Sequence, residues 1–378
     1  MDVKQDVRIV NYFFKFGKLL GVTPLNRENH FTLCVIYKLY VLILLISTIF
    51  GSLFSIISRY TGFWTQSTIS QVILESVEII SEMLFMICTF LGALRYGNIW
   101  KDIFSTLEKV DNELRMEKLV LFETDKYWYI VKIVLFHFAY FCLHAYELLM
   151  WTGKSSRVNE YGYILYRIIM YYQFFMTLFA VKIIEVLQSR FQDLEKILKE
   201  VSSRSNIIIS KTDNNILKRL WKLRKLYGSL YNVHQNVNLV FRYSIFYGTL
   251  SNILIVLGDL NYIVQFAHTS DEEFNIGVSF INTLYSVFYS TASVSIVMSC
   301  DRLEKIGQNM VTTCYLYRNI FEKTTVTNEF VSLAEYTNNM IPTFSAAGFF
   351  QVNQQLMSTL ISAIITYFII IIQFNLRF

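Results

Sequence analysis

The chain contains 378 residues, of which 54% are hydrophobic, 17% are charged and only two are prolines. Its mean hydropathy of +0.39 exceeds that of a water-soluble globular protein of this size, so an ordinary soluble enzyme is excluded. An aromatic content of 16% excludes a disordered or collagen-like chain. The net charge of +5 is modest and there is no basic tail, so nucleic acid is not an expected partner.

Seven apolar segments follow one another along the chain, each close to or longer than the about 20 residues needed to cross hydrocarbon. They cover residues 34–57, 72–94, 128–149, 161–184, 242–266, 276–298 and 344–374. Backbone groups find no water in hydrocarbon, and the runs lack the alternation of outer-membrane strands, so helices are expected. The predicted fold class is an all-α membrane protein with seven transmembrane helices.

The basic residues indicate how these helices are oriented. Of the Lys and Arg residues between the apolar segments, 25 lie in the N-terminal segment and the connections on its side, and 4 lie on the other side. The positive-inside rule then predicts a cytoplasmic N-terminus and an extracellular C-terminus. This orientation is opposite to that of a G-protein-coupled receptor, and the chain also lacks an NPxxY motif. Neither a cleaved signal peptide nor a disulfide framework is expected.

The predicted organisation alternates membrane and cytoplasmic parts. Six transmembrane helices are expected in two groups, four in 34–187 and two in 242–298. The cytoplasmic parts are expected to be the N-terminal segment 1–33, a helical hairpin at 188–241 and a second segment at 299–343. Residues 344–378 are expected to form the last transmembrane helix.

The hairpin prediction rests on two apolar stripes whose members recur at steps of four and three residues, the period of one helix face. The stripes are Leu187, Phe191, Leu194, Leu198 and Val201, and Ile216, Leu220, Leu223, Tyr227 and Leu230. The alternative is a pair of amphipathic helices lying on the anionic inner leaflet, which the basic residues of the second stripe's helix would also suit.

The sequence contains no catalytic or metal-binding pattern. A glycine-rich phosphate loop and the motifs HExxH, CxxC and GxSxG are absent, and the histidines are scattered. His137 and His144 share a helix face, but no cysteine or carboxylate stands at a spacing that completes a metal site. We therefore expect no enzymatic activity, no metal and no cofactor. Many secondary transporters show an inverted repeat in hydropathy, and this chain shows none. A secondary transporter therefore stays only as the alternative from another functional class.

The last apolar segment carries a polar stripe. As one helix, residues 344–374 would be about 46 Å long against a hydrocarbon layer of about 30 Å, so its first turns are expected to lie in the cytoplasm. Spacings of seven, four and seven place its polar residues within roughly 20° of one line. These residues are Gln355, Ser362, Thr366 and Gln373. Two interpretations stay open: a seam along which helices pack, or a pore wall constricted by Ile370 and Gln373.

The end of this segment carries a family signature. Thr366 and Tyr367, then five hydrophobic residues, then Gln373 and Phe374 resemble the motif that closes the last helix of insect gustatory receptors. Upstream residues also resemble that family's entry into the same helix, namely Ala347, Gly348, Phe349, Phe350, Val352 and Asn353. Seven spans, an inside N-terminus and a chain near 400 residues agree with the family along the whole length.

The resemblance implies a ligand-gated, non-selective cation channel. It also implies a location in the plasma membrane of the dendrites of chemosensory neurons. It implies a homo- or heterotetramer of related subunits in the bilayer, opened by a small-molecule tastant, with cytoplasmic helices forming a central anchor. Carried over, the extracellular gate falls on Gln373 and Phe374, with Thr366 and Tyr367 near it. The related odorant receptors share this architecture, and an odorant receptor subunit is the nearest alternative.

A ligand pocket is expected among ionisable and aromatic residues in the outer halves of the spans, because charged groups inside a membrane mark functional sites by default. In the family the resemblance points to, ligands enter the helical bundle of each subunit from outside. The candidates are Glu75, Glu78, Glu82, His144, Tyr146, Glu147, Tyr163, Tyr166, Arg167, Asp259, Tyr262, Gln265, Asn282, Tyr285 and Tyr289. The alternative is structural: Arg167 pairs with Glu147 or Asp259, and the tyrosines anchor the interface.

Overall fold

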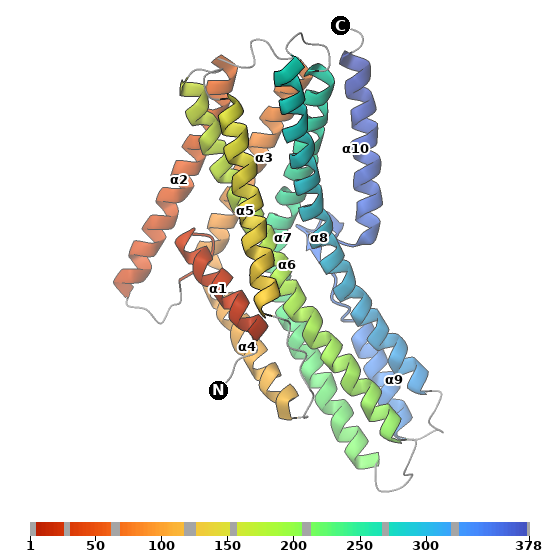
Figure 1. Cartoon of the computed structure of the whole chain (residues 1–378). Helices are drawn as coiled ribbons and strands as arrows, with labels where there is room; N and C mark the ends of the chain where they lie inside the picture. Colours follow the sequence, from red (N-terminus) through yellow and green to blue (C-terminus); the bar gives the residue numbers. More distant parts are fainter. Residues whose placement is uncertain are drawn as a thin grey trace.

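The structure is a computed structural model that describes residues 5–25, 31–61, 69–116, 126–151, 157–205, 213–266, 272–318 and 325–375. These residues form helices and one short hairpin (Figure 1). The elements in chain order are α1 (Gln5–Leu19), α2 (Phe31–Thr61), α3 (Ile69–Arg95), α4 (Gly97–Met116), α5 (Lys126–Trp151), α6 (Arg157–Ser205), α7 (Asp213–Phe266), α8 (Glu272–Arg318), α9 (Thr325–Asn338), β1 (Ser345–Ala346), β2 (Phe350–Gln351) and α10 (Gln354–Asn375). The expected all-α membrane architecture is confirmed.

Five helices of the described chain are long and apolar enough to cross a membrane, and these are α2, α3, α6, α7 and α8. α5 and α10 contain shorter apolar stretches, Ile133–Leu149 and Gln354–Ile370. Helices α6, α7 and α8 have 49, 54 and 47 residues, more than twice the length that hydrocarbon requires. They run on together below the level of α10, where α9 lies beside them (Figure 1).

The two apolar stripes lie in the extended parts of α6 and α7, and all ten of their residues are buried. The two helices contact each other, and both contribute to one continuous core with α8 and α9. Tyr227 also links α7 to the segment after α9, because its hydroxyl donates a hydrogen bond of 2.9 Å to the carbonyl oxygen of Met340. The apolar faces of this hairpin are therefore covered by protein.

A buried ion-pair cluster joins three helices where α6 leaves the apolar bundle. The Arg190 side chain is fully buried, and its Nε and Nη2 donate to the two carboxylate oxygens of Asp111 on α4 at 3.1 and 3.0 Å. Nη2 also donates to Asp6 Oδ1 at 3.0 Å, and Nη1 donates to the other oxygen of Asp6. This cluster fixes α1 and α4 against α6, because an unpaired charge buried there would be strongly unfavourable.

The last helix begins later than the sequence predicts. Residues 344–353 do not form helix: strands β1 and β2 pair there, and the turn between them places Ala347 and Gly348 at φ of 53° and 86°. Such angles are incompatible with an α-helix. The helix starts at Gln354, whose backbone N–H is capped by Asp301 Oδ1 of α8 at 3.1 Å. With 22 residues α10 is about 33 Å long, close to the hydrocarbon thickness, so the prediction of one continuous helix over residues 344–374 is wrong.

Candidate functional site

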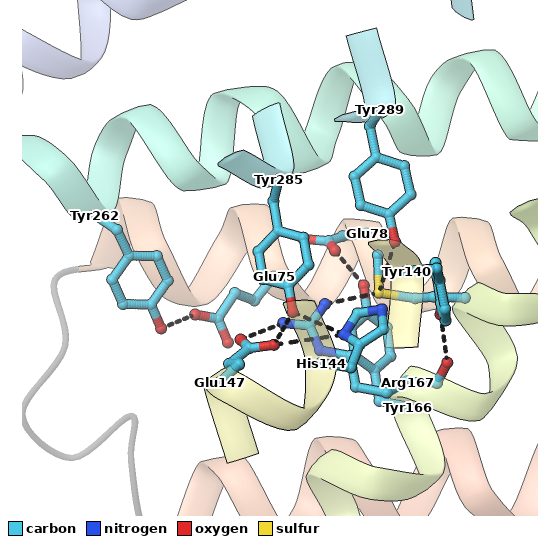
Figure 2. Close-up of polar contacts among 11 residues, drawn as sticks. Glu75, Glu78, Tyr140, His144, Glu147, Tyr166, Arg167, Tyr262, Tyr285 and Tyr289 are labelled. Atoms are coloured by element: carbon cyan, nitrogen blue, oxygen red, sulfur yellow. Dashed lines mark hydrogen bonds and ion pairs between the residues drawn. The ribbon is translucent and has the colours of Figure 1, made fainter. Parts of the chain in front are cut away.

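A polar network lies between five helices at the end of the bundle away from α9 (Figure 2). Its first wall is α3, on which Gln71, Glu75, Glu78 and Glu82 recur at steps of four, three and four and so share one face. Gln71, Glu75 and Glu82 are buried, and Glu78 is half-buried. This face is turned into the bundle because the neighbouring positions on α3 are apolar and several of them, such as Ile73 and Ile80, are exposed.

Arg167 of α6 lies at the centre of the network. Its Nη2 forms an ion pair of 2.6 Å with Glu147 Oε1 of α5. The guanidinium carbon lies 4.8 Å from the ring centre of Tyr285 on α8 and 5.6 Å from that of Tyr166. Both distances are within cation–π range, so the charge is stabilised by a carboxylate and two aromatic faces.

Tyr285 connects two polar side chains of α5. Its hydroxyl donates to Glu147 Oε2 and lies 2.7 Å from Nδ1 of His144. Figure 2 shows these groups converging from α5, α6 and α8 on one point. Arg167 therefore pairs with Glu147, as the structural alternative predicts. Tyr285 and His144 extend this ion pair.

The α3 carboxylates bond to tyrosines of the facing helices. Tyr262 of α7 donates to Glu75 Oε1 at 2.7 Å, and Gln71 donates to the same oxygen at 2.6 Å. Tyr166 of α6 donates to Glu78. These side chains cross-link α3 to α6 and α7 through hydrogen bonds from neutral donors.

The remaining predicted residues occupy different environments. Asp259 accepts a 3.0 Å hydrogen bond from Ser286, and the Tyr289 hydroxyl points to the sulfur of Met170. Asn282 is buried on α8, whereas Tyr146 is 44% exposed. The side chains of Tyr163 and Gln265 lie outside the described residues.

Glu82 differs from the other acidic residues. It is fully buried, and neither carboxylate oxygen has a hydrogen-bond partner within the described part of the chain. The cluster holds five carboxyl groups, namely those of Glu75, Glu78, Glu82, Glu147 and Asp259, against one guanidinium. The site is therefore rich in hydrogen-bond acceptors and suited to a ligand that brings donors or positive charge. No group of three or more metal-ligating side chains is found in the described ranges.

Tyr140 and Gln71 belong to the network and were missed by sequence reasoning. Tyr140 is buried and donates to the backbone oxygen of Arg167 at 3.0 Å, and Gln71 links Glu75 to Asn261. A periodicity argument could have found both. Tyr140 precedes His144 by four residues, and Gln71 precedes Glu75 by four, so each extends a stripe already recognised.

The polar stripe of α10 is not covered by the other described parts of the chain. Gln355, Ser362, Thr366 and Gln373 are all exposed, and Ile370 is 39% and Tyr367 57% exposed. α10 contacts α7 and α8 and stands at the edge of the bundle (Figure 1). A packing seam within this one chain therefore does not account for the stripe. The side chain of Phe374 lies outside the described residues.

The fold and site define a multi-pass, all-helical membrane protein with a polar network buried between its helices. Residues 10–378 match the sequence profile of the 7tm chemosensory receptor family, and the chain belongs to that family. The expected kinship with insect chemoreceptors is thereby confirmed. No curated protein sequence matches the chain.

Two solved structures support the fold. The chain is similar to the olfactory receptor OR5 of the insect Machilis hrabei in complex with eugenol, with a TM-score of 0.64 and 13% identity over 97% of this chain and 98% of that one. For a second structure of the same receptor the TM-score is 0.58, with the same identity and coverage. At this identity the likeness concerns the fold.

Proposed function

We propose that this protein is a gustatory receptor subunit that forms a tastant-gated, non-selective cation channel. The observation that carries the proposal is the uncovered polar stripe of α10, which ends in the signature from Thr366 to Phe374. In hydrocarbon, exposed amide and hydroxyl side chains need water or another protein chain as a partner. A tetramer whose α10 helices surround a central axis supplies both.

In this arrangement each residue of the stripe has a role. Gln355, Ser362 and Thr366 line a wet conduit, and Ile370 and Gln373 form the constriction near the C-terminal end. Phe374 and Tyr367 belong to the gate region by the family signature. A ligand that favours the open state moves α10 away from the axis and lets cations pass.

The proposed orientation has a cytoplasmic N-terminus, seven transmembrane helices and an extracellular C-terminus. The 25 basic residues on one side against 4 on the other support it. α5 and α10 supply the two spans beyond the five long apolar helices, and the joined extensions of α6, α7 and α8 with α9 form the cytoplasmic anchor. The protein is proposed to reside in the plasma membrane of sensory-neuron dendrites.

The polar network around Arg167 is proposed as the tastant site. It lies within the bundle toward the proposed outer side, and α3, α5, α6, α7 and α8 all contribute to it. Because it contains more acceptors than donors, a polar ligand with several hydroxyl or amino groups fits it best.

An odorant receptor subunit is the second candidate function. The structural likeness to an olfactory receptor favours it, and the shared fold supports either ligand class. The signature from Thr366 to Phe374 favours the gustatory assignment.

The direct test is whole-cell current from cells that express this chain, with G-protein signalling blocked, during application of sugars, bitter compounds and volatiles. A ligand-evoked cation current is expected, alone or after co-expression of a related subunit. Stoichiometric substrate flux without a conductance, or a response that G-protein block abolishes, would contradict the channel proposal.

The pore role of α10 is tested by cysteine accessibility. Thr366→Cys lies on the stripe, and Ile364→Cys lies about 160° away around the same helix. A charged thiol reagent applied from outside should reduce the current through Thr366→Cys channels and leave Ile364→Cys channels unchanged. Equal responses of the two variants would refute the assignment. Gln373→Ala should in addition change the current–voltage relation or the dose response.

A further inference from the structure

A groove with a volume of about 690 Å³ separates α1 from α5 and α6. The α5 residues that line it lie between Ile133 and Phe138, on the N-terminal side of the network residues of the same helix, Tyr140, His144 and Glu147. Its walls include Arg8, Tyr12 and Phe16 of α1, Val134 and Phe138 of α5, and Phe175 of α6. The α1 residues recur at steps of four, so one face of that helix borders the groove.

The groove exists because α5 is poorly covered by protein in this half. Among the described side chains of α5, Tyr140 and Glu147 are buried, and both lie toward the other end of the helix. Closer to the start, Val134 is 59% and Phe138 65% exposed. The floor is protein, since Phe175 is 1% exposed.

The open side of the groove faces the bilayer. Val134 and Phe138 belong to an apolar stretch of α5 proposed to cross the membrane, and an exposed apolar side chain at that depth meets lipid. An occupant therefore reaches the groove from within the membrane. Its apolar and aromatic walls suit a hydrocarbon chain.

The charge at the groove selects the headgroup. Arg8 is an exposed cation on its wall, and Lys15 is exposed on the same helix. Asp6, an acidic residue of this segment, is already engaged by Arg190. Within its described range α1 carries Arg8, Lys15 and Lys18 against one acidic residue, so the helix has an excess of positive charge, which favours an anionic headgroup. With the orientation proposed above, this is the cytoplasmic leaflet, where anionic lipids are found.

We propose that this groove is a binding site for an anionic phospholipid, whose acyl chain lies between α1 and α5 and whose headgroup contacts Arg8. The lipid completes the packing of the half of α5 that protein leaves uncovered. The site is separate from the proposed pore and tastant site, so its failure leaves the channel proposal intact.

Native mass spectrometry of the full-length protein in detergent tests the proposal, with phosphatidylserine and phosphatidylcholine of identical acyl chains as probes. The wild type should retain phosphatidylserine in preference to phosphatidylcholine. Arg8→Gln should weaken phosphatidylserine retention by about five-fold, the effect of one basic contact with an anionic lipid. Lys109→Gln, which removes an exposed cation of α4 away from the groove walls, should leave it unchanged.

A second pair of variants tests the acyl-chain position. Val134→Trp puts a large ring on the groove wall and should reduce retention of both lipids. Leu135→Trp is the matched control, because Leu135 is 56% exposed but does not line the groove. Equal retention of the two lipids by the wild type would overturn the headgroup assignment. Equal lipid retention by the two tryptophan variants would overturn the placement of the acyl chain in this groove.

Discussion

Replacing Arg190 by methionine is expected to destabilise the protein through two carboxylates left without their partner. Methionine fills much of the volume of the arginine stem but carries no charge. Asp111 would then stay on α4 with a side chain 6% exposed, and Asp6 on α1 with one 14% exposed. Four hydrogen bonds to these two carboxylates would be lost together.

The magnitude follows from the burial of the cluster. Removing one partner of a buried ion pair destabilises a protein by about 3–5 kcal/mol, most of it from the uncompensated charge. The upper half of that range applies to Asp111, whereas Asp6 lies in the first turn of α1 and regains some water when that helix shifts. At about 2 °C per kcal/mol for a large chain, the melting temperature should fall by roughly 6–10 °C.

The assay is thermal unfolding of the purified protein in detergent, followed by loss of the monodisperse peak in size-exclusion chromatography. Arg302→Met serves as the control, because Arg302 is an exposed residue of α8 and such a change is expected within about 0.5 kcal/mol of the wild type. A melting temperature of Arg190→Met within about 1 °C of the wild type would show that the cluster contributes little.

A compensating variant tests the physical reason. If the unpaired carboxylates cause the loss, adding Asp6→Leu and Asp111→Leu to Arg190→Met should recover most of it, because an apolar cluster of similar volume can replace buried charges. A triple variant that melts as low as Arg190→Met would refute this reasoning and assign the loss to packing.

Three further changes probe other parts of the molecule. Tyr285→Phe removes a hydroxyl bonded to a carboxylate and should raise the half-maximal tastant concentration by about ten-fold or more, whereas Tyr146→Phe, at an exposed position, should not; equal dose responses would contradict the site. Gly228→Ala places a methyl group against the Tyr336 hydroxyl, so the substitution should be about 1–3 kcal/mol less favourable with Tyr336 than in a Tyr336→Phe background, and equal melting shifts in the two backgrounds would disprove the contact. Asp301→Ala removes the cap of α10 and should lower stability by about 1 kcal/mol, while Asp301→Asn should retain it; identical melting of both variants would argue against capping.

Part of the network around Arg167 was predictable from helix periodicity. Glu75, Glu78 and Glu82 share a face by their spacing alone, and a charged face on an apolar helix must turn inward. The spacing could not say which partner each charge has. Arg167 had Glu147 and Asp259 as candidates, and the structure brings it to Glu147, 20 residues away on the preceding helix.

The start of α10 shows where sequence periodicity fails. Residues 344–353 continue an apolar run, and a count of apolar residues extends the helix through them. A helix through these residues is excluded by the positive φ angles of Ala347 and Gly348. The cap from Asp301 instead marks Gln354 as the start of the helix. The cap lies 53 residues away along the chain, so no local pattern reveals it.

The sequence by itself determined the membrane class, the helical fold, the two apolar stripes of the hairpin and the polar stripe of α10, because each depends on composition or on a helical period. Only the tertiary structure decided the contacts between distant segments. Arg190 meets Asp6 across 184 residues, and the groove beside α5 arises where α1 and α6 leave that helix uncovered. Such pairings depend on how helices pack, and periodicity specifies the face of a helix without specifying its neighbour.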